Sequence, residues 1–145
     1  MLRILVINGP NLNLLGERDT KVYGSATLDD VNAGIAARAR ELGAQVVFFQ
    51  SNHEGALIDK IHAERHTADG IIINPGALTH YSYSLRDALE AVEPPAVEVH
   101  ISDINKREEF RRVSLVTDVA WKTVMGKGTD GYIEALEALV AHLSG

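Results

Sequence analysis

Hydrophobic and polar positions form two kinds of pattern that alternate along the chain. Short, almost unbroken apolar runs are typical of strands buried on both faces, whereas apolar residues spaced three and four apart are typical of amphipathic helices. The apolar runs cover Leu2–Ile7, Gln45–Gln50, Gly70–Asn74, Ala96–Ile101 and Val119–Met125. The helical patterns cover Thr27–Gly43, Leu57–Thr67, Leu85–Val92 and Ile133–Leu143, with one or two helical turns over Asn105–Arg112.

Strands that alternate with helices predict a parallel sheet with helices on both of its faces. We therefore predict an α/β fold in which residues 1–145 form a single domain with a flavodoxin-like, doubly wound, five-stranded parallel sheet. In such sheets ligands bind beyond the carboxyl ends of the strands. Polar side chains stand at these strand ends in the sequence, namely Asn8, Asn11, Ser51, Asn52, Asn74, His80, His100 and Ser102.

The first predicted strand leads into a long charged segment, Leu12–Ser25, that has no regular periodicity. Long loops in compact domains are usually functional, and a charged loop that begins at a buried strand end is a candidate active-site lid. We predict a lid over residues 17–25. The alternative is a surface loop that only connects a strand to a helix.

The composition excludes several classes of function. A net charge of −6 argues against nucleic acid as the main partner. The lack of cysteine excludes disulfides, cysteine–zinc sites and thiol nucleophiles. No apolar run approaches ~18 residues, and the N-terminus lacks a basic segment followed by an apolar stretch, so neither a membrane span nor a signal peptide is predicted. We therefore expect a cytoplasmic protein.

His100 is the strongest candidate for chemistry. Glu98 lies two positions before it on a predicted strand, so both side chains share one face of the sheet. A carboxylate beside an imidazole fixes the tautomer and stabilises the protonated form, which suits a general acid. The alternative is a half-buried histidine beside a surface glutamate.

Two groups of charged and aromatic residues are further candidates. Tyr23 and Arg18 share the predicted lid, and a guanidinium near a tyrosine favours the phenolate that a general base needs. Arg107, Arg111 and Arg112 follow the fourth strand, where their forked donors can bind a carboxylate or hydroxyl groups. The alternatives are an ordinary loop for the first group and a solvated helix paired with neighbouring glutamates for the second.

Two further motifs match known patterns without the context that those patterns need. Residues Gly126–Gly131 match G-x-G-x-x-G, but the chain ends before the acidic residue that a dinucleotide site needs about 20 positions later. A tight turn between a strand and a helix is the better interpretation. His62 and His66 are four apart, yet the glutamate of the zinc-protease motif is absent. We therefore predict no metal site.

Taken together, several ordered blocks give the chain a close resemblance to type II 3-dehydroquinate dehydratases, or type II dehydroquinases, over nearly its whole length. The blocks that carry the resemblance are Asn8–Gly16, Gln50–Gly55, Asn74–His80, Leu85–Leu89, Glu98–Ser102, Arg107–Arg111 and the Gly126–Tyr132 turn.

The resemblance implies a lyase that needs no cofactor and converts the small molecule 3-dehydroquinate to 3-dehydroshikimate, in the shikimate pathway or in quinate catabolism. It also implies a homododecamer built from trimers. The catalytic roles that it implies are Tyr23 as base, Arg18 as its cationic partner, Asn11 as holder of a water at the enolate oxygen, and His100 as acid with Glu98 behind it. The implied substrate-binding groups are Asn74, His80, Arg111, the backbone of Ile101 and Ser102, and Asp87 in the site of a neighbouring subunit.

The chain departs from the family pattern at a few positions. Asp19–Thr20 stands where the family has Glu-Pro in the lid, and Asp103, Val113 and Lys122 replace the usual Asn, His and Gly. None of these removes a proposed catalytic group. The alternative that they leave open is that the chain is a relative of the family that binds the substrate without turning it over. A flavin- or nucleotide-binding module is the alternative from another functional class, motivated by the doubly wound sheet and the Gly126–Gly131 turn.

Overall fold

The computed structural model describes residues 1–145, apart from the side chain of Val22. Its strands form one parallel sheet in the order β2-β1-β3-β4-β5, with every neighbouring pair parallel. The strands are β1 (Leu2–Asn8), β2 (Ala44–Gln50), β3 (Gly70–Asn74), β4 (Ala96–His100) and β5 (Lys122–Met125). The predicted flavodoxin-like, doubly wound, five-stranded sheet is therefore confirmed.

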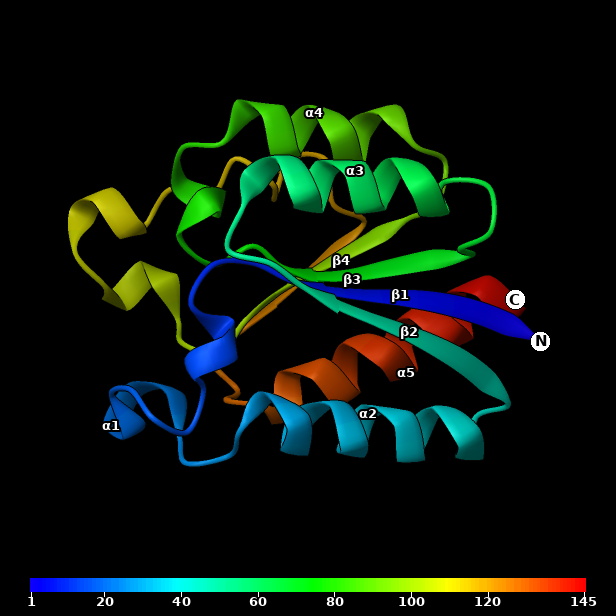
Figure 1. Cartoon of the computed structure of the whole chain (residues 1–145), viewed down its shortest axis with the longest axis horizontal. Helices are drawn as coiled ribbons and strands as arrows, with labels where there is room; N and C mark the ends of the chain where they lie inside the picture. The colour runs from blue at the N-terminus through cyan, green and yellow to red at the C-terminus, as the bar shows by residue number, and fades with distance from the viewer.

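The long helices cover both faces of this sheet. Figure 1 shows α3 and α4 on one face and α2 and α5 on the other. Their bounds are α2 (Leu28–Glu41), α3 (Glu54–Glu64), α4 (Tyr83–Ala91) and α5 (Asp130–Ser144). None of the helices among the described residues is both long and apolar enough to cross a membrane.

The apolar run of β1 explains its central place in the sheet. Ile4 and Val6 belong to the core under α2 and α5, whereas Leu5 and Ile7 belong to the core under α3 and α4. Because successive strand residues point to opposite faces, only a run without polar interruptions can fill both cores. The strand ends at Asn8, where the site begins.

The start of α2 follows the capping pattern of its sequence. Thr27 Oγ1 accepts a hydrogen bond from the backbone N–H of Asp30 at 3.1 Å, and Asp30 Oδ2 accepts one from the N–H of Thr27 at 3.0 Å. This is a capping box with aspartate in place of glutamate. The capping box fixes the start of α2, which follows the segment that contains the predicted lid.

Two predictions of local structure need correction. The fifth strand begins at Lys122 rather than at Val119, because the N–H groups of Val119 and Ala120 close a turn onto the carbonyl of Val116. The segment Leu12–Ser25 is also less irregular than its sequence suggested. It contains the 3-10 turn η1 (Leu12–Leu14) and the short helix α1 (Thr20–Tyr23).

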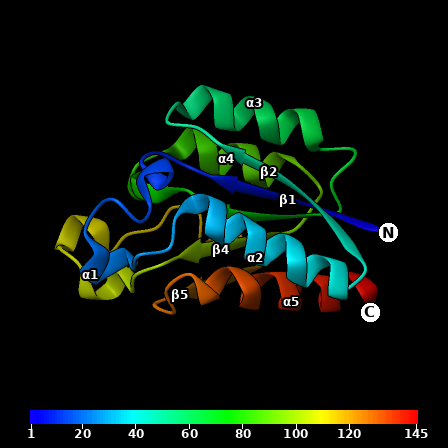
Figure 2. The same cartoon turned by 60° about the horizontal axis from the view of Figure 1, so that its bottom comes forward.

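The connections at the carboxyl ends of the strands gather at one edge of the molecule. In Figures 1 and 2, α1 and the two 3-10 turns that follow β4 lie together beyond this edge. These turns are η3 (Ile104–Lys106) and η4 (Glu109–Arg111), within the segment predicted to hold one or two helical turns. The edge is therefore enclosed by segments that are 80 or more residues apart in sequence.

Candidate active site

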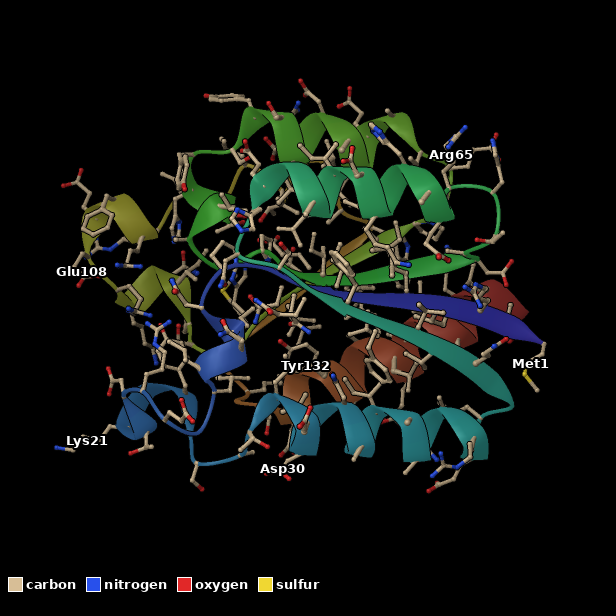
Figure 3. The ribbon with its side chains drawn as sticks, in the orientation of Figure 1. Met1, Lys21, Asp30, Arg65, Glu108 and Tyr132 are labelled. Carbon is tan, nitrogen blue, oxygen red and sulfur yellow. The ribbon has the colours of Figure 1, made fainter. Side chains whose placement is uncertain are left out.

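A pocket opens at the carboxyl edge of the sheet, between the segment that carries α1 and the segment that carries η3 and η4. Lys21 and Glu108 mark these two bordering segments in Figure 3. The residues that line the pocket are Pro10, Asn11, Leu12, Arg18, Tyr23, Asn74, Gly76, Ala77, His80, His100, Ile101, Ser102, Ile104, Arg107 and Arg111. Most of the side chains that the sequence singled out therefore meet in one place.

His100 and Glu98 form a buried pair at the end of β4. The Nε2–H of His100 donates to Glu98 Oε2 at 2.5 Å, and the side chains are 7% and 0% exposed. Their shared face follows from the two-residue period of a strand. The alternative of a surface glutamate is thus wrong, since Glu98 lies entirely behind His100 and only the histidine lines the pocket.

Glu98 is surrounded by hydroxyl groups in place of water. Its Oε1 accepts hydrogen bonds from Thr117 Oγ1 at 2.6 Å and from Thr123 Oγ1 at 2.9 Å. Its Oε2 accepts from Thr79 Oγ1 at 3.1 Å and from Ser114 Oγ. With His100, these hydroxyls form a cage of donors around a carboxylate that has no contact with solvent.

The donor cage keeps this carboxyl ionised. Burial by itself raises the pKa of Glu98, but the hydrogen bond and charge of His100 and the hydroxyls of Ser114 and Thr117 outweigh it and lower the pKa to about 2. An anion therefore stands behind the imidazole, where it accepts the Nε2–H hydrogen bond and orients the ring. The geometry suits a general acid.

Tyr23 lines the same pocket as His100 and is flanked by two guanidinium groups. The Arg18 Cζ lies 4.6 Å from the centre of the Tyr23 ring, and Arg18 Nη2 lies 3.5 Å from the phenol oxygen. Arg107 Nη1 donates to the same oxygen at 3.3 Å. The hydrogen bond to Tyr23 raises the pKa of Arg107, so this guanidinium stays positively charged beside the phenol.

The contact between Arg107 and Tyr23 was not predicted from the sequence. Arg107 was a candidate to bind a carboxylate or hydroxyl groups within the arginine cluster, but 84 residues separate it from Tyr23. Its Nη1 also donates to Ser102 Oγ at 3.2 Å, which links the segment after β4 to the phenol. The alternative of a solvated helix holds only in part. Arg111 does pair with Glu108 at 3.1 Å, yet both Arg107 and Arg111 line the pocket.

Two of the residues that line the pocket are asparagines, one shortly after β1 and one at the end of β3. Asn11 has a left-handed backbone with φ of 70°. Its N–H donates to Asn52 Oδ1 at 2.9 Å, so the polar end of the second strand holds the turn after the first. Asn74 Oδ1 accepts from the N–H of Gly76 at 3.1 Å, which fixes the next loop in the same way.

The loop that carries His80 is tied to the segment after η4. The Nδ1 of His80 lies 2.6 Å from the carbonyl of Val113, and the N–H of Leu115 donates to the carbonyl of Thr79 at 2.7 Å. Val113 thus contributes its backbone, which the replacement of the family histidine leaves unchanged. These bonds fix the chain on the C-terminal side of the arginine segment.

Two other positions singled out in the sequence do not line the pocket. Asp87 is on α4, where its side chain is 69% exposed and borders a separate groove with Ile58 and His62. Asp103 immediately precedes η3, and its Oδ1 accepts from the N–H of Asn105 at 3.0 Å. The aspartate that replaces the usual asparagine therefore serves as a helix cap.

The rejected motifs have structural roles among the described residues. Gly126 and Gly128 have φ of 77° and 61° in the turn from β5 into α5, as expected for a tight connection. His62 lies on α3, and no group of three histidine, aspartate or glutamate side chains in the described part of the chain is placed to hold a metal ion.

Comparisons with known proteins agree on one family. The model of the family described as dehydroquinase class II matches residues 2–140. A 3-dehydroquinate dehydratase from Halothermothrix orenii is 56% identical over 140 residues, which are 97% of this chain and 95% of that protein. A catabolic 3-dehydroquinase from Verticillium alfalfae is 52% identical over 97% of this chain and 94% of its own length. The crystal structure of a type II dehydroquinase from Butyrivibrio crossotus has a TM-score of 0.93 at 47% identity, covering 95% of this chain and 97% of that one.

Proposed function

Because the chain belongs to the class II dehydroquinase family, we propose that it is a hydro-lyase that dehydrates 3-dehydroquinate to 3-dehydroshikimate by an anti elimination through an enolate. One observation carries the mechanism. A phenol flanked by two guanidinium groups shares a single pocket with a histidine that is backed by a buried, ionised carboxylate. These are a base and an acid with opposite electrostatic surroundings, which is how paired acid–base catalysts are usually tuned.

Tyr23 is the proposed base. A tyrosine phenol titrates near pH ~10, so the phenolate needs cations nearby to act at neutral pH. Arg18 and Arg107 supply two positive charges at the phenol oxygen and over the ring. The phenolate would remove a proton from C2 of the substrate, and the electron pair would move to the C3 carbonyl oxygen to give the enolate.

Asn11 is proposed to hold a water molecule at this enolate oxygen. Its side chain lines the pocket, and its backbone is fixed by Asn52. A donor that is already in place where negative charge develops lowers the barrier without reorganisation during the reaction.

His100 is the proposed acid. The collapse of the enolate breaks the C1–oxygen bond, and the imidazolium donates its proton to the leaving hydroxyl, which departs as water. Because Nε2 is committed to Glu98, the Nδ1 edge of the ring is the one that serves the substrate. The proton taken by Tyr23 and the proton given by His100 balance over the reaction, so no external oxidant, reductant or co-reactant is consumed.

Substrate binding is assigned to the remaining polar lining. Asn74, His80 and Arg111 would bind the hydroxyl groups, and the backbone N–H groups of Ile101 and Ser102 would bind the carboxylate. All five residues line the pocket. The reaction would serve the shikimate pathway or quinate breakdown, since relatives named for the reaction and for catabolism match at 56% and 52% identity.

Residues 17–25 are proposed to act as a lid over the bound substrate. Their contacts to the rest of the pocket include the hydrogen bond from Arg107 to Tyr23. Opening the segment would break that contact and carry the base away from the acid, so closure would assemble the catalytic pair and exclude water.

Asp87 is proposed to act in the site of a neighbouring subunit, within a homododecamer built from trimers. Its exposed side chain, which borders a groove outside its own pocket, supports this assignment. Light scattering would measure the assembly. A fully active monomer would rule out a role for Asp87 in a neighbouring site.

The test of the function is formation of the conjugated enone product, followed by its ultraviolet absorbance after addition of 3-dehydroquinate. We expect turnover by the purified chain and a fall of about 10²–10⁴ in kcat for Tyr23→Phe and for His100→Ala. Tyr83→Phe is the matched control, because this tyrosine is 66% exposed and lies outside the pocket lining. A folded wild-type protein that gives no product would overturn the proposal.

Arg107 has its own experiment. Arg107→Lys keeps a positive charge but loses the planar fork that reaches both Tyr23 and Ser102. We expect kcat to fall at least about tenfold, since one charge-assisted hydrogen bond contributes ~1.5–3 kcal/mol. Arg40→Lys is the control, because Arg40 is exposed and does not line the pocket. Equal activities of the two variants would remove Arg107 from the mechanism.

A further inference from the structure

The turn Gly126–Tyr132 is a family block that the proposed mechanism leaves without a role. It ends at Tyr132, in the first turn of α5. Tyr132 is completely buried in the core beneath the sheet, between the sheet and the helices of that face. Figure 3 shows it there, close to the carboxyl ends of the strands. A buried tyrosine hydroxyl needs partners, and the partners of this one belong to the active site.

The hydroxyl of Tyr132 joins the two asparagines that end β1 and β3. It donates to Asn8 Oδ1 at 2.6 Å and accepts from Asn74 Nδ2 at 2.9 Å. Asn8 and Asn74 are register partners in adjacent strands, and they are 2% and 4% exposed. The result is a directed chain of hydrogen bonds from Asn74 through Tyr132 to Asn8.

This chain of hydrogen bonds fixes the orientation of the Asn74 side-chain amide. Asn74 Oδ1 already accepts from the N–H of Gly76 at 3.1 Å, while Nδ2 donates to Tyr132. A reversed amide would place its NH₂ group against the Gly76 N–H, donor against donor. It would also offer an oxygen to the hydroxyl whose proton is already committed to Asn8. Buried donors and acceptors that lose their partners are costly, so only one orientation satisfies all of these groups.

The fixed orientation leaves a donor for the pocket. Among the described residues, the second hydrogen of Asn74 Nδ2 has no acceptor, and Asn74 lines the pocket. An oxygen of the substrate that accepts a hydrogen bond, such as a hydroxyl or carbonyl, is the matching group.

We propose that Tyr132 is a positioning residue that holds the Asn74 amide so that it presents an N–H donor to a substrate oxygen. The inference rests on the proposed function, because Asn74 matters for turnover only if the substrate occupies this pocket. Tyr132 does not touch the substrate. It acts from the core through Asn74, and Asn8 sets the direction of its hydroxyl proton.

The kinetic test is a double-mutant cycle of Tyr132→Phe and Asn74→Ala. Phenylalanine keeps the packing and removes the oxygen, and a lost hydrogen bond lowers kcat/KM by about three- to tenfold, mostly through KM. In the Asn74→Ala background the same change should alter kcat/KM by less than about twofold. A merely structural role predicts the contrary result, in which the two effects multiply. Tyr83→Phe is the matched control.

A crystal structure of Tyr132→Phe without substrate provides the independent readout. We expect the Asn74 amide nitrogen, which has lost its acceptor, to move away from its wild-type position. An unmoved Asn74, together with unchanged kinetics, would overturn the inference. If Tyr132→Phe does not fold, Asn8→Ala tests the same chain, because it removes the acceptor of the tyrosine proton and should couple to Asn74→Ala in the same way. A wild-type protein without turnover would refute the proposed function, while the crystal structure would still decide the position of Asn74.

Discussion

Replacing Glu98 by glutamine tests whether the buried carboxylate is ionised in the folded protein. Glutamine keeps the shape of the side chain but carries no charge and brings two donor hydrogens. These would face the hydroxyls of Thr117 and Thr123 or those of Thr79 and Ser114, which now donate to the carboxylate. The variant therefore removes the anion and creates donor–donor conflicts in a site that is closed to water.

The magnitude follows from the pKa of Glu98, which is about 2 in the folded protein against an ordinary value of 4.5. A group whose folded pKa is depressed stabilises the protein above its unfolded pKa, and this stability is lost as the pH falls toward the folded pKa. The difference corresponds to roughly 3 kcal/mol at neutral pH, of which about 2 kcal/mol is gone by pH ~3.

The assay is urea unfolding at a fixed protein concentration, at intervals between pH 7 and pH 3. We expect the free energy of unfolding of the wild type to exceed that of Glu98→Gln by at least about 3 kcal/mol near pH 7 and to converge toward it as the pH falls. Glu93→Gln is the control, because this carboxylate is exposed. A difference between wild type and Glu98→Gln that stays constant with pH would refute the argument that Glu98 is an anion in the fold.

Three other changes test separate parts of the site. Asn52→Ala frees the backbone of Asn11, so kcat/KM should fall about tenfold with a loss of ~1 kcal/mol of stability; unchanged kinetics would exclude this support. Gly9→Ala places a Cβ 2.4 Å from the Pro75 carbonyl oxygen, and thermal unfolding should show a loss of about 1–3 kcal/mol; an unaltered Tm would contradict that contact. Asp103→Asn keeps the helix cap but removes a negative charge, so KM for the anionic substrate should fall about two- to fivefold at low salt, and the difference should vanish in ~1 M salt.

The sheet was predictable because each strand carries its own signal. The apolar run from Ile4 to Ile7 contributes to the cores on both faces of the sheet. Such a run fits only a strand in the middle of the sheet. The start of β5 was not predictable in this way. Val119 and Ala120 are apolar, as strand residues often are. Their N–H groups, however, donate to the carbonyl of Val116 in a turn, so the strand begins only after them. The single turn of α1 is too short to show a helical period.

The pairing of Glu98 with His100 was predictable from local spacing, since two positions along a strand bring them together. The surroundings of each proposed catalytic group were not. The hydroxyls around Glu98 come from loops and a strand 16 to 25 residues away, and Arg107 reaches Tyr23 across 84 residues. Such contacts depend on tertiary packing, which no short-range pattern records. What the sequence does show is that polar residues stand at the ends of the strands, where the pocket forms.

The proposed acid and base are held by different kinds of structure, and this bears on the departures from the family pattern. His100 sits on a buried strand and is held by its hydrogen bond to Glu98, so its position does not depend on the proposed lid. Tyr23 sits on a single helical turn whose preceding residue, Asp19, has a left-handed φ of 25°. A non-glycine residue in a sparsely populated backbone region stores about 1–3 kcal/mol of strain. Thr20 also leaves the open segment more freedom than proline would, so closure must order more chain. Both effects act on the base alone, and we therefore expect Asp19 and Thr20 to alter lid closure while they leave the acid unchanged.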